Sequence, residues 1–78
     1  MREFEIRLRS VQDVQEFVAL ATAQSFEVLA GTDAYKVSGK SFMEMFCLDF
    51  TRTMYAYADC PEEDFLKFRE AAQRFLVK

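Results

Sequence analysis

Residues 4–21, FEIRLRSVQDVQEFVALA, decide the fold because the spacing of their apolar residues changes within one stretch. From Phe4 to Leu8, apolar and charged residues alternate, which is the period of a β-strand with one face in water. Ser10 then provides the side chain of a helix N-cap. The apolar residues after it recur at helical spacing: Val11, Val14, Phe17, Val18 and Ala21. The stretch therefore predicts a strand followed directly by a helix that runs to about Gln24.

Three further strands and a long helix are indicated downstream of this stretch. Ser25 to Ala30 predicts a strand, followed by a turn at Gly31-Thr32-Asp33 and a partner strand from Ala34 to Ser38. Thr53 to Ala58 predicts another strand because it is rich in Thr and Tyr, which favour strands. Pro61 suits the first position of a final helix, whose acidic first turn complements the helix dipole.

The order of these elements predicts an α+β fold. With a short helix at residues 42–48, the order is strand, helix, strand, strand, short helix, strand, long helix. Four strands with helices laid on one face bury these apolar patterns in two layers. Because 78 residues suffice for one hydrophobic core but not for two, we expect residues 1–78 to form a single domain.

The composition excludes several classes of function. The chain has no histidine, which excludes imidazole catalysis, histidine-ligated metal and phosphohistidine chemistry. Cys47 and Cys60 are the only cysteines, and their spacing forms neither a zinc site nor a redox pair, so we expect no metal and no cofactor. A net charge of −3 argues against nucleic acid as the main ligand, and no apolar run is long enough to cross a membrane. We therefore expect a soluble, cytoplasmic protein.

The short helix carries more apolar surface than a helix on one side of a sheet can bury. Six of the seven residues from Phe42 to Leu48 are apolar. At about 100° of rotation per residue, Met45 and Leu48 lie on one side of the helix. A separate arc holds Phe42, Met43, Phe46 and Cys47. If Met45 faces the sheet, this arc has the composition expected of a partner-binding face; otherwise the arc is core, or loops cover it, and spacing alone leaves these alternatives open.

Ser41 is predicted to cap the short helix, because Ser41 with Glu44 three residues later matches the capping box. A phosphate on Ser41 would face backbone N–H groups that lack an intrahelical partner, and would stabilise the start of the helix. Lys40 lies next to it in the sequence and would pair with the phosphate. Caps are common, however, so the pattern leaves open both a purely structural serine and a switch.

A distinctive segment reads Gly39-Lys40-Ser41-Phe42-Met43, with Leu48 further on. It resembles the regulatory-serine segment of HPr, the phosphocarrier of the bacterial sugar phosphotransferase system, and the order of elements is similar as well. The resemblance implies an open-faced β-sandwich, in which a four-stranded antiparallel sheet has three helices on one face. It also implies that an ATP-dependent kinase phosphorylates Ser41. The partner-binding residues that it implies are Lys40, Phe42, Met43 and Phe46.

The chain departs from HPr at the residue that accepts phosphate. With Phe17-Val18 as the anchor, the family's histidine falls near Ser10, its arginine near Gln12 and its proline near Asp13. Ser10 could not replace the histidine as a high-energy carrier, because it would form a stable ester. The resemblance therefore implies a regulatory or repurposed relative that is not an enzyme. Its partners would be proteins, such as an HPr kinase/phosphorylase or a transcriptional regulator.

Two other functions follow from the residues themselves. A free Phe and Met face on a small domain favours self-association, so the same patch predicts a constitutive homodimer as the alternative. An enzyme is the weaker hypothesis, because no spacing links the available polar groups. These groups are Arg7, Arg9, Arg52 and Asp49. Tyr55 and Tyr57 stand at strand spacing and could stack a ligand, although such residues more often pack within a sheet.

Overall fold

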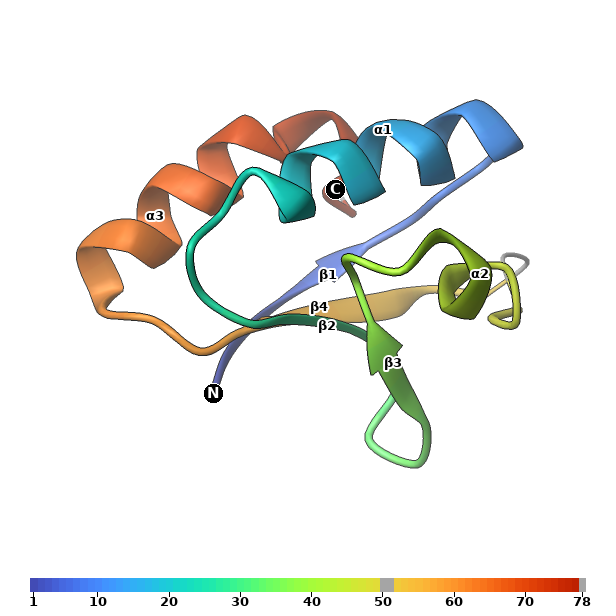
Figure 1. Cartoon of the computed structure of the whole chain (residues 1–78), viewed down its shortest axis with the longest axis horizontal. Coiled ribbons are helices and arrows are strands. Elements are labelled where there is room, and N and C mark those ends of the chain that lie inside the picture. The colour runs from blue at the N-terminus through green and yellow to red at the C-terminus, as the bar shows by residue number, and fades with distance from the viewer. Residues whose placement is uncertain (50–51, 78) are drawn as a thin grey trace.

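The computed structural model of the protein describes residues 1–49 and 52–77. It has two layers, with α1 and α3 lying side by side over a twisted sheet and α2 near the β3 edge (Figure 1). The elements in chain order are β1 (Arg2–Ile6), α1 (Val11–Thr22), β2 (Val28–Gly31), β3 (Lys36–Ser38), α2 (Phe42–Met45), β4 (Met54–Ala58), α3 (Glu62–Ala71) and a 3₁₀ turn (Gln73–Phe75). The predicted order of strands and helices is confirmed.

The sheet is antiparallel throughout, with the strand order β1-β4-β2-β3. In the central strand β4, Ala56 pairs with Phe4 of β1 and Ala30 of β2, which sets the register. The period of two places Met54, Ala56 and Ala58 under the helices, where all three are buried. A four-stranded antiparallel sheet with three helices matches the predicted α+β architecture and the HPr-like open-faced β-sandwich.

The core between the two layers combines aliphatic side chains with a group of phenylalanines that contact one another. Phe68 of α3 lies at its centre, with ring centroids 5.6 Å from Phe4, 6.4 Å from Phe17 and 5.7 Å from Phe26. Edge-on and tilted contacts of this kind add to the stabilisation that burial itself provides. The aromatic contacts therefore connect β1, α1 and α3 and hold the two long helices on the sheet.

Tertiary hydrogen bonds shift several element boundaries from those predicted. β1 begins at Arg2 and ends at Ile6, rather than spanning residues 4–8, because the Arg7 N–H donates to the Phe75 carbonyl (2.8 Å) and the chain leaves the sheet. Leu8 is nevertheless fully buried. The Thr32 N–H donates to the Tyr35 carbonyl and the Tyr35 N–H donates to the Thr32 carbonyl. Because this turn extends to Tyr35, β3 begins at Lys36 instead of Ala34.

The helices also differ in their ends. α2 ends at Met45 instead of Leu48, because the N–H groups of Cys47 and Leu48 donate to carbonyls three residues back and tighten the turn. Pro61 is the N-cap of α3, with φ −62° and ψ 159°, and not its first helical residue. Within the described residues, no helix has the length and apolar character needed to cross a bilayer.

Candidate functional site

Ser41 occupies the N-cap of α2, as its spacing to Glu44 predicts. Its backbone is extended (φ −106°, ψ 112°), and its Oγ accepts a hydrogen bond from the Glu44 N–H at 3.3 Å. The Ser41 N–H donates to the Ser38 carbonyl (3.2 Å), so among the described residues only one of the two capping-box hydrogen bonds forms. Ser41 as a whole is half-buried, between the β3 edge strand and the helix.

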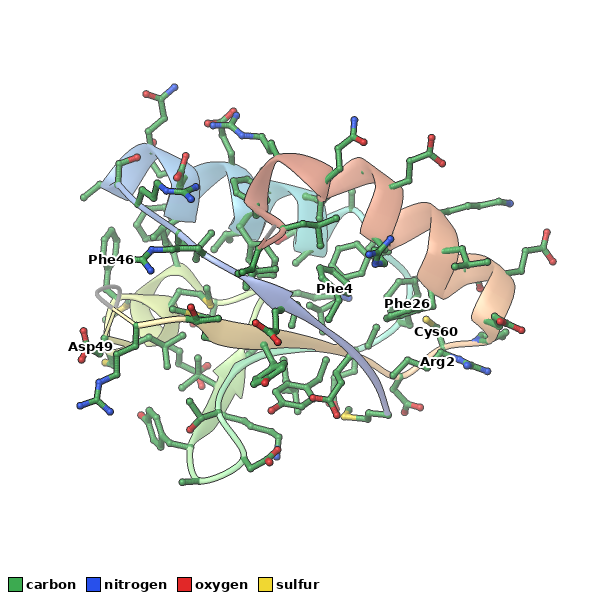
Figure 2. All side chains as sticks on the ribbon, turned by 180° about the vertical axis from the view of Figure 1, so that it is seen from behind. Arg2, Phe4, Phe26, Phe46, Asp49 and Cys60 are labelled. Atoms are coloured by element: carbon green, nitrogen blue, oxygen red, sulfur yellow. The ribbon has the colours of Figure 1, made fainter. Side chains whose placement is uncertain are left out.

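The orientation of α2 decides between the two faces that its spacing left open. Met45 is completely buried and points into the core, with Leu48 half-buried beside it. Met43 is 83% exposed and Phe46 is 41% exposed. Phe42 is half-buried and packs against the core, with its ring 4.6 Å from that of Phe46. We call Phe42, Met43 and Phe46 the α2 surface; Phe46 lies at the end of the molecule opposite to Arg2 and Cys60 (Figure 2).

The Lys40 side chain is held by a backbone carbonyl just beyond the end of α1. Its ammonium donates a hydrogen bond to the Gln24 carbonyl at the end of α1, at 2.8 Å. The Lys40 N–H donates to the Ser38 hydroxyl at 3.2 Å. To pair with a phosphate on Ser41, the Lys40 side chain would have to leave the Gln24 carbonyl. In this structure Lys40 therefore joins the start of α2 to the end of α1.

Ser10 caps α1 at the position where the resemblance places the histidine of HPr. Its Oγ accepts from the Asp13 N–H at 3.1 Å, and the Asp13 carboxylate accepts from the Arg9 N–H at 2.9 Å. This reciprocal pair satisfies two backbone donors at the start of the helix. Ser10 offers a hydroxyl and no ring nitrogen, so its chemistry is that of an ester-forming group.

The polar residues considered for an enzyme do not form one site. Arg52 pairs with Asp49 at 3.4 Å, and both side chains are mostly exposed. Arg7 and Arg9 line a separate cleft. The described residues include no group of three Cys, Asp or Glu side chains that could hold a metal ion.

Tyr57 is part of the packing on the open face of the sheet. Its hydroxyl donates to Asp33 at 3.1 Å, and the Lys36 ammonium lies 4.8 Å from the centre of its ring. The Tyr55 ring centroid is 6.2 Å away. Burial, together with the hydrogen bond to Asp33, raises the pKa of Tyr57 to about 12. Tyr57 is only 4% exposed and is therefore closed to a stacking ligand.

Comparison with known proteins supports the fold. No protein-family model matches the chain, and no curated protein is significantly similar to it in sequence. Among solved structures, it is similar to HPr-C-His from Thermoanaerobacter tengcongensis, with 23% sequence identity and a TM-score of 0.72. The similarity covers 91% of this chain and 89% of the other. The chain therefore has an HPr-like fold.

Proposed function

We propose that this protein is a regulatory or repurposed relative of the HPr phosphocarrier, which docks partner proteins through the α2 surface and accepts a phosphate on Ser41. The observation that carries the proposal is the exposure of Met43 and Phe46 directly after a capped serine. The proposed role is non-enzymatic and belongs to a bacterial cytoplasm. It requires no phosphohistidine, in keeping with a sequence that has no histidine.

The packing of α2 supports docking by a preorganised surface. Phe42 is held against the core, and its ring lies 4.6 Å from Phe46, which limits the positions open to the Phe46 ring. Met43 is flexible, and its thioether adapts to differently shaped partners. An aromatic side chain that is already oriented loses little conformational entropy on binding. We therefore assign the anchoring contact to Phe46 and the adaptable contact to Met43.

A phosphate on Ser41 would act on this surface through charge. It would place about −1.5 to −2 charges and three acceptor oxygens at the start of α2. The Ser41 Oγ already accepts from the Glu44 N–H, so a phosphate oxygen could retain the cap and leave the fold intact. The exposed Glu44 carboxylate would add to the negative potential beside Met43. We expect phosphorylation to weaken the binding of acidic partners and to strengthen the binding of partners whose interface has a basic rim.

The phosphorylation is tested with an HPr kinase/phosphorylase and ATP. We expect the intact mass to rise by one phosphate and peptide mapping to place it on Ser41. The matched control is Ser41→Asn, which retains a capping side chain but has no hydroxyl to phosphorylate. No gain in mass, or an equal gain in Ser41→Asn, would refute the switch while leaving docking to its own test.

Docking is tested with the Ser41→Asn protein, which cannot be phosphorylated. Its binding to the same kinase is monitored by the broadening of the NMR signals of the Ser41→Asn protein. We expect the double substitution Met43→Ser, Phe46→Ser to weaken binding about tenfold or more, as is typical when central interface residues are truncated. Leu66→Ser is the control, because Leu66 is an exposed apolar residue of α3, 54% exposed. Equal weakening by the control variant would mean that the α2 surface has no special part in docking.

The same exposed residues support a constitutive homodimer as the second candidate function. An isologous contact would bury Met43 and Phe46 of both copies. Sedimentation equilibrium distinguishes the two candidates, since a dimer that dissociates in the Met43→Ser, Phe46→Ser variant would support self-association. A monomer at high micromolar concentration would contradict it.

A further inference from the structure

The fold assembles three arginines from opposite ends of the sequence around one cleft. Arg7 and Arg9 come from the connection between β1 and α1, and Arg74 comes from the 3₁₀ turn near the C-terminus. The cleft has a volume of about 400 Å³, and its other lining residues are Thr53, Leu76 and Val77. Backbone hydrogen bonds hold its sides together: the Arg7 N–H donates to the Phe75 carbonyl, and Ile6 forms a bridge with Leu76.

Arg74 is fixed in place by two carboxylates of α1. Its guanidinium donates to Glu16 at 2.6 Å and to Asp13 at 3.0 Å, and its central carbon lies 5.0 Å from the Phe75 ring centre. A guanidinium has five N–H donors, so donors remain for a further acceptor. The side chain is 54% exposed, which leaves part of it accessible from the cleft.

The other two arginines carry charge that the described residues leave unpaired. Within residues 1–49 and 52–77, no carboxylate pairs with the guanidinium of Arg7 or Arg9. Arg7 is half-buried and Arg9 is exposed. Because Asp13 and Glu16 already pair with Arg74, the charge that the cleft can offer an anion comes mainly from Arg7 and Arg9, beside the apolar side chains of Leu76 and Val77.

From this arrangement we propose that the cleft binds a small phosphate monoester. Arginine forks match the geometry of phosphate oxygens, and the Thr53 hydroxyl is a further donor. Leu76 and Val77 provide an apolar wall against which the organic part of the ester lies. The volume falls within the range of small-molecule sites. This site is separate from the α2 surface, with which it shares no residue.

Phenyl phosphate is a suitable probe, because it combines a phosphate with a compact apolar group. We would titrate it at about pH 7.5, where a phosphate monoester is a dianion, and follow the backbone amide signals by NMR. We expect saturable shifts at the lining residues with a dissociation constant of roughly 1 mM or tighter. Inorganic phosphate should bind at the same place but more weakly, since it makes no use of the apolar wall.

The decisive variant is Arg7→Gln, Arg9→Gln, which leaves the Arg74 ion pairs intact. It should weaken phenyl phosphate binding about tenfold or more, because hydrogen bonds to charged groups contribute on that scale. The control Arg2→Gln, Lys67→Gln removes the same number of charges from residues outside the cleft and should bind within about twofold of wild type. If the double variant does not fold, Arg9→Gln alone, at an exposed side chain, takes its place. Unsaturable shifts, unchanged binding in the arginine variant or equal weakening in the control would overturn the proposal.

Discussion

Two methionines of α2 allow the orientation of this helix to be tested with one kind of substitution. Met43 and Met45 lie two residues apart in the same short helix, but Met43 is 83% exposed and Met45 is completely buried. Replacing each methionine by alanine removes the same atoms, and methionine and alanine have similar helix propensities. The difference between the two variants therefore measures burial alone. We expect Met45→Ala to be strongly destabilising and Met43→Ala to be nearly neutral.

The expected magnitudes follow from the two environments. Truncation of a fully buried methionine costs about 2–5 kcal/mol, which includes the cavity left behind. Exposed substitutions usually stay within about 0.5 kcal/mol. A domain of this length has a free energy of unfolding of about 4–12 kcal/mol, so Met45→Ala would remove a large part of it. Its melting temperature should fall by about 10 °C or more, whereas that of Met43→Ala should change little.

Urea unfolding followed by circular dichroism measures both variants. The midpoint of Met45→Ala should fall without a change in the slope of free energy against urea, which would show that the variant unfolds from the same folded state. A loss above about 2 kcal/mol in Met43→Ala would place its side chain in the core. That result would refute the orientation of α2 and, with it, the proposed docking surface.

Three further predictions concern the cap, the thiols and the open face of the sheet. Ser41→Ala should cost about 1 kcal/mol in urea unfolding, whereas Ser41→Asn should retain most of that stability, and equal losses would contradict the cap. Exposed Cys47 should react with a thiol reagent before half-buried Cys60, since burial raises the pKa of the Cys60 thiol. The Cys47→Ser variant should therefore lose the faster phase of the reaction, and loss of the slower phase instead would contradict the structure. The protonated Tyr57 phenol stabilises the folded state fully below about pH 10, and this contribution is lost as the pH rises through about 12. Unfolding at several alkaline pH values should show this loss in wild type and a smaller loss in Tyr57→Phe.

Local sequence patterns predicted the elements whose causes are local. The hydroxyls of Ser10 and Ser41 each accept from an N–H three residues later, as their spacing predicts, because an N-cap depends only on its own first turn. The ends of elements were less predictable, because they depend on partners distant in sequence. β1 ends where the Arg7 N–H turns to the Phe75 carbonyl, a contact that no local period encodes.

The arginine cleft shows where sequence reasoning reached its limit. Arg7 and Arg9 could be identified as candidate polar residues, but nothing in the spacing related them to Arg74, more than sixty positions away. The fold brings them together because the end of the chain forms a bridge with Ile6 beside the β1–α1 connection. A hint was available, since Asp13 and Glu16 place two acidic residues on one face of α1, and such a pair favours a cationic partner.

The absence of histidine determines which phosphate chemistry remains open to this chain. A phosphoimidazole transfers its phosphoryl group readily, whereas an ester on Ser41 is stable and suits a lasting signal. Binding at Arg7 and Arg9 forms no covalent bond. The phosphate groups of the two proposed functions can therefore be removed in different ways. A phosphate on Ser41 should survive dialysis and be released by a phosphatase, while a monoester in the cleft should be lost on dialysis and displaced by salt. Intact mass and the NMR titration therefore test the two functions independently, and either one can fail without the other.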